Sequence, residues 1–372
     1  MRGVSRAQAD LNHNPSPNPS PSPSPQRDPI LSPAQLAHYA ENGVLVVPRA
    51  QLGLSESDIA SAKSQLARTL HDRVGCDAAN LADSAGLLAG LSSTSGAGGI
   101  LDLFYESFQL GLAERPAIAA VVCELWAHSM DSYRDKFDPW TPLAGVDRVC
   151  FRVPDTISAK FGRGKCGLQR HLAPHLDRCP HDVAGAEAST KWRPIQCFLS
   201  LSDTLGESEG GFEACPGLHR DFASWAQRRA PSVSTGQPAP CVGDFTPMRP
   251  VEDADILGRM KHVPCRAGDL VLWDNRIPHA NSRRNLAAEP RQVVYLKYLP
   301  NVECNRRYVR SQLPNFASHC VPTDFWINPP ASPPLALGSE EPAQPPSLDE
   351  LGRRMFGLAE WREGESVWDY CT

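Results

Sequence analysis

Residues 265–300 have the sequence CRAGDLVLWDNRIPHANSRRNLAAEPRQVVYLKYLP, and this stretch decides the expected fold. Apolar side chains recur at every second position, at 270 and 272 within residues 270–274 and at 294, 296 and 298 within residues 291–298, which is typical of β-strands. The loop between the two runs is polar and ends in proline, as hairpin connections longer than a tight turn often do. The pattern therefore predicts two strands folded back on one another, with His279 close to Arg291.

A second motif lies upstream, where His175 and Asp177 are two residues apart and so share one face of an extended backbone. With His279 they have the composition of a two-histidine, one-carboxylate triad, which holds non-haem Fe(II) and leaves coordination positions open. Arginine presents a planar fork that takes a carboxylate bidentately. Arg291 could therefore anchor the far end of a dicarboxylate whose near end chelates the metal.

Each of these signals is weak alone. A His-x-Asp triplet occurs by chance, a lone His279 fits a structural histidine, and a lone Arg291 fits a charge on a strand surface. The motifs gain weight from their order along the chain and from the Gly-Gly and Pro-Gly turns between them. Taken together, they favour a metal site.

The ordered motifs resemble those of the Fe(II)/2-oxoglutarate-dependent dioxygenases, and within them the phytanoyl-CoA dioxygenase-like group. The resemblance covers residues 31–315. It rests on YAENGVLVVP at 39–48, the HLD triplet at 175–177, RPIQCFLSLSDTLGESEGGFEACPGLH at 193–219, GDLVLWDNRIPH at 268–279, and Arg291. It implies a mainly β fold with α-helical buttresses around a double-stranded β-helix, a cupin-like jelly roll. Many short strands between glycine and proline turns favour the same core.

The resemblance also implies an activity: hydroxylation of a small organic substrate with Fe(II) and O2, coupled to decarboxylation of 2-oxoglutarate to succinate and CO2. Ascorbate would serve as a reductant. His175, Asp177 and His279 would hold the iron, and Arg291 would bind the far carboxylate of 2-oxoglutarate. Gln196 stands where the family commonly carries a polar residue near the cosubstrate, although a glutamine on a solvated strand fits this position equally well.

Two other functions stay open. One is a catalytically silent binding module on the same fold. The other is a zinc-dependent hydrolase, since zinc accepts the same three ligands and activates a bound water; this reading gives Arg291 no role. Cys215 and His219 have a spacing seen in zinc sites, but the Pro-Gly pair between them indicates a structural turn.

Composition narrows the class of partner. With 372 residues, 41% of them hydrophobic, the chain can bury a sizeable core, and a net charge of −5 gives no general attraction for nucleic acid. No apolar run reaches the ~18 residues of a membrane span. The twelve cysteines are scattered and show no CxxC pair, so we expect reduced thiols and a cytoplasmic protein. Basic residues at 160–178 could receive an anionic group of the substrate, although charge runs are usually solvated.

Local signals divide the chain into four parts. Residues 1–30 carry a Pro-Ser repeat and are expected to be disordered. Arg2, Arg6 and several serines leave an organelle transit peptide open, although the acidic Asp10 argues against it. Residues 31–315 would form the oxygenase-like domain, with helices beginning after Ser32, after Ser55 and at Pro116. Residues 316–346 form a Pro-rich connector. In residues 347–372, Ser347 and Glu350 predict a capped helix that docks on the core.

Overall fold

The computed structural model of the protein describes residues 28–94, 96–130, 137–162, 168–180, 191–228, 245–318, 320–322 and 347–371. Residues 1–27 of the segment expected to be disordered, and most of the Pro-rich connector, lie outside these residues. The Ile30 amide donates to Glu124 Oε1 at 2.7 Å, so the ordered part begins slightly earlier than predicted. Within the described residues, helix outweighs strand, at 41% against 18%. Helices therefore make up a larger share of the fold than expected for the predicted mainly β fold with helical buttresses.

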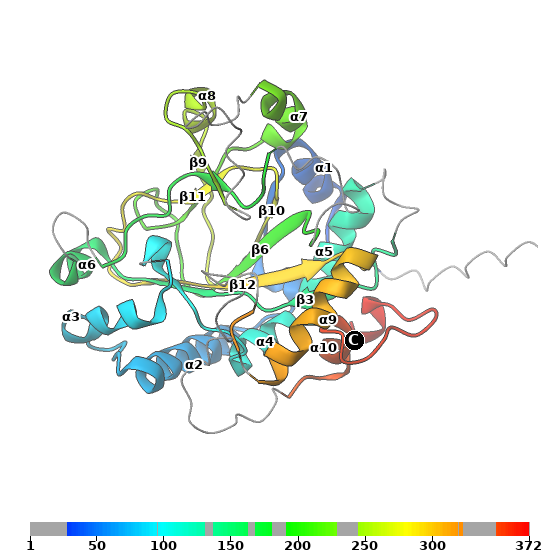
Figure 1. Cartoon of the computed structure of the whole chain (residues 1–372), viewed down its shortest axis with the longest axis horizontal. Helices are drawn as coiled ribbons and strands as arrows, with labels where there is room; N and C mark the ends of the chain where they lie inside the picture. The colour runs from blue at the N-terminus through cyan, green and yellow to red at the C-terminus, as the bar shows by residue number, and fades with distance from the viewer. Residues whose placement is uncertain are drawn as a thin grey trace, which may run out of the picture.

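Two antiparallel sheets form the centre of the protein (Figure 1). The larger runs in the order β1 (Val44–Val47), β10 (Leu270–Asp274), β6 (Ile195–Ser200), β12 (Arg291–Leu299), β4 (Val149–Arg152) and β2 (Ile100–Leu101), and β3 (Leu143–Gly145) also pairs with β12. The smaller runs in the order β8 (Thr246–Pro247), β5 (His175–Leu176), β11 (His279–Asn281), β7 (Phe212–Ala214) and β9 (Lys261–His262).

The predicted hairpin of residues 265–300 was wrong. β10 and β12 both pair with β6, which lies between them, and His279 belongs to β11 in the other sheet. All five residues of β10 are buried, which is typical of a central strand with a neighbour on each side. The period-two pattern of its side chains does not show which strands those neighbours are. The loop at residues 282–290 therefore crosses from the smaller sheet to the larger one.

The helices surround the sheets. They are α1 (Pro33–Asn42), α2 (Glu56–Val74), α3 (Leu81–Ser84), α4 (Ser107–Ala113), α5 (Pro116–Ser129), α6 (Asp155–Phe161), α7 (Leu218–Arg228), α8 (Ala254–Leu257), α9 (Glu303–Ala317) and α10 (Glu350–Met355). As predicted, Ser32 and Ser55 cap α1 and α2, and left-handed glycines end both helices. None of the helices in the described part of the chain is both long and apolar enough to cross a membrane.

The larger sheet separates two apolar clusters. Val294, Leu296 and Tyr298 of β12 pack with the helices on one face, whereas Val293 faces the smaller sheet. Figure 1 shows α2, α4, α9 and α10 on one side of β12, and β9 and β11 on the other. Since side chains alternate along a strand, Arg291 points into the space between the sheets with Val293.

The C-terminal segment docks on the helical face, as expected. Leu351 and Met355 of α10 are fully buried in the same cluster as α5. The cap of α10 is Asp349, which accepts a hydrogen bond from the Gly352 amide, and not the predicted Ser347. Asp349 is an equally good cap and lies next to the first helical residue, so the boundary shifts by two positions.

Nine described cysteines are free, which agrees with the expectation of reduced thiols. Cys179 is disulfide-bonded, however, so the expectation was wrong for this residue. A disulfide requires only that two cysteines approach in space, and the spacing of cysteines along the chain does not reveal that.

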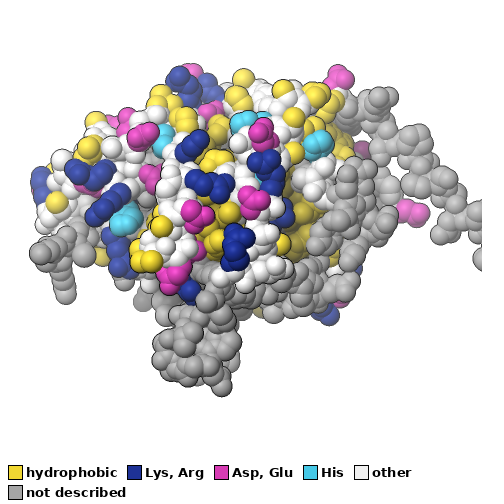
Figure 2. Space-filling model, turned by 90° about the horizontal axis from the view of Figure 1, so that it is seen from above, with side chains coloured by type: hydrophobic (Ala, Val, Ile, Leu, Met, Phe, Trp, Pro, Cys, Tyr) yellow, Lys and Arg dark blue, Asp and Glu magenta, His cyan; other side chains and the backbone are white. Residues whose placement is uncertain are grey.

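The face that carries α7 and α8 is charged but mixed in sign. Figure 2 shows the described Lys and Arg side chains interspersed with Asp and Glu, and with apolar side chains between them. Charge on this face is therefore locally balanced.

Candidate metal centre

Three candidate ligands meet on the smaller sheet. His175 on β5 and His279 on β11 are direct partners in the antiparallel ladder, and their ring centroids lie 4.4 Å apart. Asp177 follows β5 immediately. Its two carboxylate oxygens lie 3.4 Å from Nε2 of His175 and 3.4 Å from Nε2 of His279. One ligand atom from each residue falls within 4.8 Å of the others, so the three could hold one metal ion.

Both imidazoles are oriented by the backbone. Nδ1 of His175 lies 2.8 Å from the Ala173 carbonyl oxygen, and Nδ1 of His279 lies 3.1 Å from the Ile277 carbonyl oxygen. A carbonyl can only accept, so each Nδ1 carries the proton and each Nε2 keeps its lone pair. That lone pair is the ligand atom, and it faces Asp177 in both cases.

Burial and charge set the protonation of the cluster. Partial loss of water contacts would raise the pKa of the Asp177 carboxyl, which is 39% exposed, but hydrogen bonds and charge from His175 and His279 in their protonated forms hold that pKa well below its usual range. Burial, together with the neighbouring His175, lowers the pKa of His279. At neutral pH the cluster therefore holds a carboxylate beside a neutral His279, the forms in which these groups bind metals.

Aromatic rings surround the two histidines. Trp273 of β10 lies 5.0 Å from the His279 ring and Phe212 of β7 lies 5.8 Å from it. Phe245 stacks on His175 with ring centroids 4.8 Å apart, yet it is 43% exposed. One side of the cluster is thus enclosed by buried rings, and the Phe245 side opens toward solvent.

Arg291 lies inside the protein, on the inner face of β12. Its side chain is 2% exposed, its guanidinium stands 5.3 Å from the centroid of the Phe198 ring, and Nη1 lies 3.3 Å from Cys150 Sγ. Phe198 in turn packs against Trp273, which contacts His279. The arginine and the histidine are therefore joined through two aromatic rings across the space between the sheets.

Three buried donors in this region are unsatisfied within the described part of the chain: Nη2 of Arg291, Nε of Arg152 and Nε1 of Trp273. A buried donor without a partner costs free energy, about 1 to 3 kcal/mol and more when the group is charged. A carboxylate held between the sheets would satisfy Arg291. The chemistry of the buried residues thus fits an acidic ligand next to the metal cluster.

The remaining predicted residues have different positions. Gln196 is buried on the inner face of β6, directly opposite Trp273 in the ladder, so it is not a solvated strand glutamine. In the basic segment, Arg178 donates to Asn275 Oδ1 at 3.0 Å, Arg170 is exposed, and Arg163 and Lys165 lie outside the described residues. His219 does not join the cluster, because its Nε2 lies 3.0 Å from the Ala40 carbonyl oxygen.

The sequence interpretation missed several residues of this region. Phe212 and Phe245 lie on or next to strands of the smaller sheet, and Trp273 lies on β10 of the larger sheet. They therefore reach the histidines only when both sheets form and pack together. Cys150 and Arg152 alternate on β4 and so share one face, but their position opposite Val293 and Arg291 depends on long-range pairing. Only that shared face could have been read from the sequence.

Comparisons with known proteins give a match to a family model over part of the chain, and a fold. The Gig2-like family model matches residues 179–358, a range that includes His279 and Arg291. The matching model differs from the phytanoyl-CoA dioxygenase-like group that the motifs resemble. A search of curated proteins finds no match to the sequence.

Two solved structures are similar over most of the chain. One is a hypothetical protein, JW0805, from Escherichia coli, with a TM-score of 0.62 and 15% identity over 88% of this chain and 82% of that chain. The other is GlcNAc Inducible Gene 2 (DUF1479) from Candida albicans, with a TM-score of 0.61 and 15% identity over 90% of this chain and 79% of that chain. At this identity, the likeness shows a shared fold.

Proposed function

We propose that this protein is an Fe(II)- and 2-oxoglutarate-dependent dioxygenase that hydroxylates a small organic substrate, built on a double-stranded β-helix of the phytanoyl-CoA dioxygenase-like kind. One observation carries the proposal: a two-histidine, one-carboxylate cluster and a buried arginine with an unpaired donor occupy the same space between the sheets. Neither feature alone would distinguish this chemistry from a simple metal site.

The three ligands would hold Fe(II), which when bound chelates 2-oxoglutarate and activates O2 for oxidation of the substrate. His175 and His279 offer lone pairs at Nε2, and Asp177 offers a carboxylate oxygen between them. The backbone carbonyls of Ala173 and Ile277 keep both rings in this orientation. These hydrogen bonds also raise the basicity of the ligand nitrogens.

Arg291 would bind the distal carboxylate of 2-oxoglutarate. Its guanidinium is enclosed by Phe198 and Cys150, so a charge-assisted hydrogen bond formed there is not weakened by solvent. Trp273 Nε1 has no partner among the described residues and could donate to the same ligand. Gln196, the ladder partner of Trp273, would be a further contact. The buried aromatic rings would exclude water from this side of the site.

The substrate would approach from the opposite side, past Phe245. This ring is stacked on His175 and is 43% exposed, so it offers an apolar surface next to the metal ligands. A small molecule with an apolar portion near the oxidised carbon fits such a surface.

Both rival functions make different demands on the same residues. A zinc hydrolase would use the three ligands but would leave the buried Arg291 donor unexplained. A silent binding module would keep Arg291 and bind 2-oxoglutarate without consuming it. The unpaired donor of Arg291 favours a carboxylate ligand and so argues against the hydrolase.

Uncoupled turnover tests the proposal directly. The purified protein is incubated with Fe(II), 2-oxoglutarate, O2 and ascorbate, and succinate is measured by mass spectrometry. We expect slow, Fe(II)-dependent succinate formation that Zn(II) does not support and that Asp177→Ala abolishes. Succinate formation equal to that of the Asp177→Ala variant would refute the dioxygenase, and binding without turnover would identify the silent module.

A further inference from the structure

A second buried arginine stands beside Arg291. In the ladder between β4 and β12, Arg152 is the direct partner of Arg291, so both side chains lie on the inner face of the larger sheet. Arg152 is 1% exposed. Burial lowers the pKa of the Arg152 guanidinium and Arg291 adds to this effect, while Asp155 opposes it. Two adjacent buried cations are costly, so the contacts that hold Arg152 in place are informative.

Arg152 points its guanidinium at the loop that joins the two sheets. Nη1 donates to the Ser282 carbonyl oxygen at 2.5 Å and Nη2 donates to the Arg283 carbonyl oxygen at 3.3 Å. Asp155 is 3.7 Å away and one-third exposed, so it neutralises the charge only in part. The planar guanidinium thus spans two successive carbonyls, which a lysine could not do.

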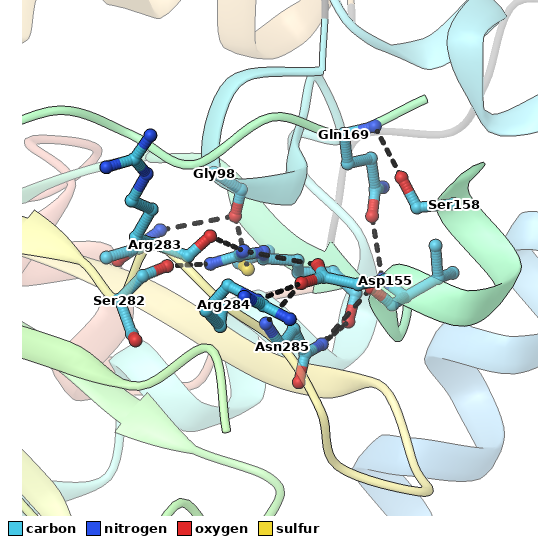
Figure 3. Close-up of polar contacts among 12 residues, drawn as sticks. Gly98, Asp155, Ser158, Gln169, Ser282, Arg283, Arg284 and Asn285 are labelled. Atoms are coloured by element: carbon cyan, nitrogen blue, oxygen red, sulfur yellow. Dashed lines mark hydrogen bonds and ion pairs between the residues drawn. The ribbon is translucent and has the colours of Figure 1, made fainter. Parts of the chain in front are cut away.

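The loop returns these hydrogen bonds. The Asn285 side-chain amide donates to the carbonyl oxygens of Arg152 at 3.0 Å and Val153 at 3.1 Å. The Asn285 backbone amide donates to Asp155 Oδ2 at 3.0 Å, and the Asp155 amide donates to the Asn285 carbonyl oxygen at 2.8 Å. Figure 3 shows the carbonyl group of Ser282 and the side chain of Asn285 turned toward this network, and the Arg283 side chain pointing away from it.

The position of this network matters because of what the loop connects. At one end it follows β11, which carries His279, and at the other end it leads into Arg291 at the start of β12. His279 is also held by pairing with β5 and β7. Arg291 is the first residue of β12 and pairs with Arg152 of β4, but the pairing of β12 with β6 begins only at Val293. Its direction therefore depends more strongly on how the loop is fixed.

We propose that Arg152 is a positioning residue: it fixes the 282–285 loop against β4 and thereby aims Arg291 at the space next to the metal cluster. This inference rests on the proposed function for the identity of the ligand that Arg291 binds. The fixation of the loop itself is independent of that function. Arg152 would act through geometry and not through its charge.

Four variants separate these effects. Arg152→Met removes the guanidinium, Arg152→Lys keeps the charge but cannot span both carbonyls, and Asn285→Ala opens the network from the loop side. Arg193→Met is the matched control. Arg193 binds Asp147 Oδ2 at 3.0 Å and the Leu296 carbonyl oxygen of β12 at 2.9 Å, at a position remote from the loop.

Two quantities are measured: hydrogen exchange of the loop amides in the metal-free protein, and the dissociation constant of 2-oxoglutarate with Fe(II) under anaerobic conditions. The amides of Ser282, Asn285 and Leu286 are hydrogen-bonded and should exchange slowly in the wild type. We expect Arg152→Met, Arg152→Lys and Asn285→Ala to speed this exchange and to weaken 2-oxoglutarate binding about tenfold, with Fe(II) affinity changed less than about threefold. Arg193→Met should leave both quantities near wild type, although it lowers the melting temperature.

Wild-type exchange and affinity in Arg152→Lys would overturn the inference, because charge alone would then suffice. Unchanged loop exchange in Arg152→Met and Asn285→Ala would also overturn it. If the wild type binds no 2-oxoglutarate, the proposed function fails, and the exchange measurement alone decides whether Arg152 fixes the loop.

Discussion

At the scale of single residues, the site depends on Asp177 more than on either histidine. Among the residues that the structure describes, its carboxylate is the acidic group that contacts both Nε2 atoms. We expect Asp177→Ala to abolish tight Fe(II) binding, since a metal held by two neutral imidazoles loses a charged ligand. The side chain is 39% exposed, so the melting temperature of the metal-free protein should change little. Titration calorimetry measures the Fe(II) affinity, and scanning calorimetry measures the melting temperature. Asp72→Ala, at an exposed acid on α2, is the control, and equal Fe(II) affinity in the two variants would exclude the cluster.

Arg291 carries the second residue-scale prediction. Arg291→Leu removes a charge-assisted contact worth about 1.5 to 3 kcal/mol, so the dissociation constant of 2-oxoglutarate should rise roughly 10- to 150-fold. Fe(II) affinity should barely change. The control is the double variant Arg283→Leu, Arg284→Leu, whose side chains are exposed, with Arg284 3.6 Å from Asp155. A loss confined to the double variant would transfer the role to the loop.

The sequence alone identified those residues whose side-chain type itself indicates metal or carboxylate binding. The triplet spacing predicted that His175 and Asp177 lie together, and the structure brings His279 to them. The sequence could not reveal Trp273, Phe245 or Arg152 as neighbours, because an aromatic or an arginine on a strand has many possible environments. Which one it occupies is set by the pairing of strands far apart in the chain.

At the scale of elements, the turn between α1 and β1 shows how closely the helices pack against the rest of the fold. Gly43 has φ +66, and a Cβ there would lie 2.6 Å from His219 Nδ1. Gly53 has φ +63 with open space around it. Gly53→Ala should therefore cost about 1 to 2 kcal/mol from backbone strain alone, and Gly43→Ala should cost more. Urea denaturation measures the free energy of unfolding of each variant. Equal losses in the two variants would mean that the His219 side chain moves away from the added Cβ at no cost.

The docking of α10 should depend on pH. Burial raises the pKa of Glu114 to about 7, and the charge of Asp349, whose amide donates to Glu114 Oε2 at 2.9 Å, adds to the rise. Since the unfolded pKa is about 4.5, the folded state binds more protons between pH 4.5 and 7. Stability from this group is therefore fully present below pH 4.5 and is lost as pH rises to 7.

Glu114→Gln removes that dependence. We expect the free energy of unfolding of the wild type to fall relative to the variant between about pH 5 and pH 7, and the two profiles to run parallel above pH 8. The exposed Glu360→Gln serves as the control. Parallel profiles over the whole range would contradict the raised pKa.

Elements with their own start and stop signals were predictable. The capping serines located the starts of α1 and α2 to within a residue. The strands β10 and β12 were also located, but their partners were not, because a period-two pattern is the same for a hairpin and for strands separated by β6.

At the scale of the whole molecule, the two ends of the chain should differ in importance. Deleting residues 1–27 should leave the melting temperature unchanged, since a Pro-Ser segment has little apolar surface to bury. Deleting residues 347–372 removes Leu351, Met355, Phe356 and Val367 from the helix-side core. At about 1.5 to 3 kcal/mol each, their burial is comparable to the whole net stability of a domain, about 5 to 15 kcal/mol. Thermal unfolding of both truncations checks this, and a stable, soluble C-terminal truncation would contradict it.

The central claim is that the cluster and Arg291 form one site for Fe(II) and 2-oxoglutarate, and an anaerobic calorimetric titration tests it most directly. 2-Oxoglutarate is titrated into the wild type with and without Fe(II), and into Asp177→Ala with Fe(II). We predict binding in the wild type that requires Fe(II), and little binding in Asp177→Ala. Equal 2-oxoglutarate affinity with and without the metal, or no binding in any of the three titrations, would contradict the account.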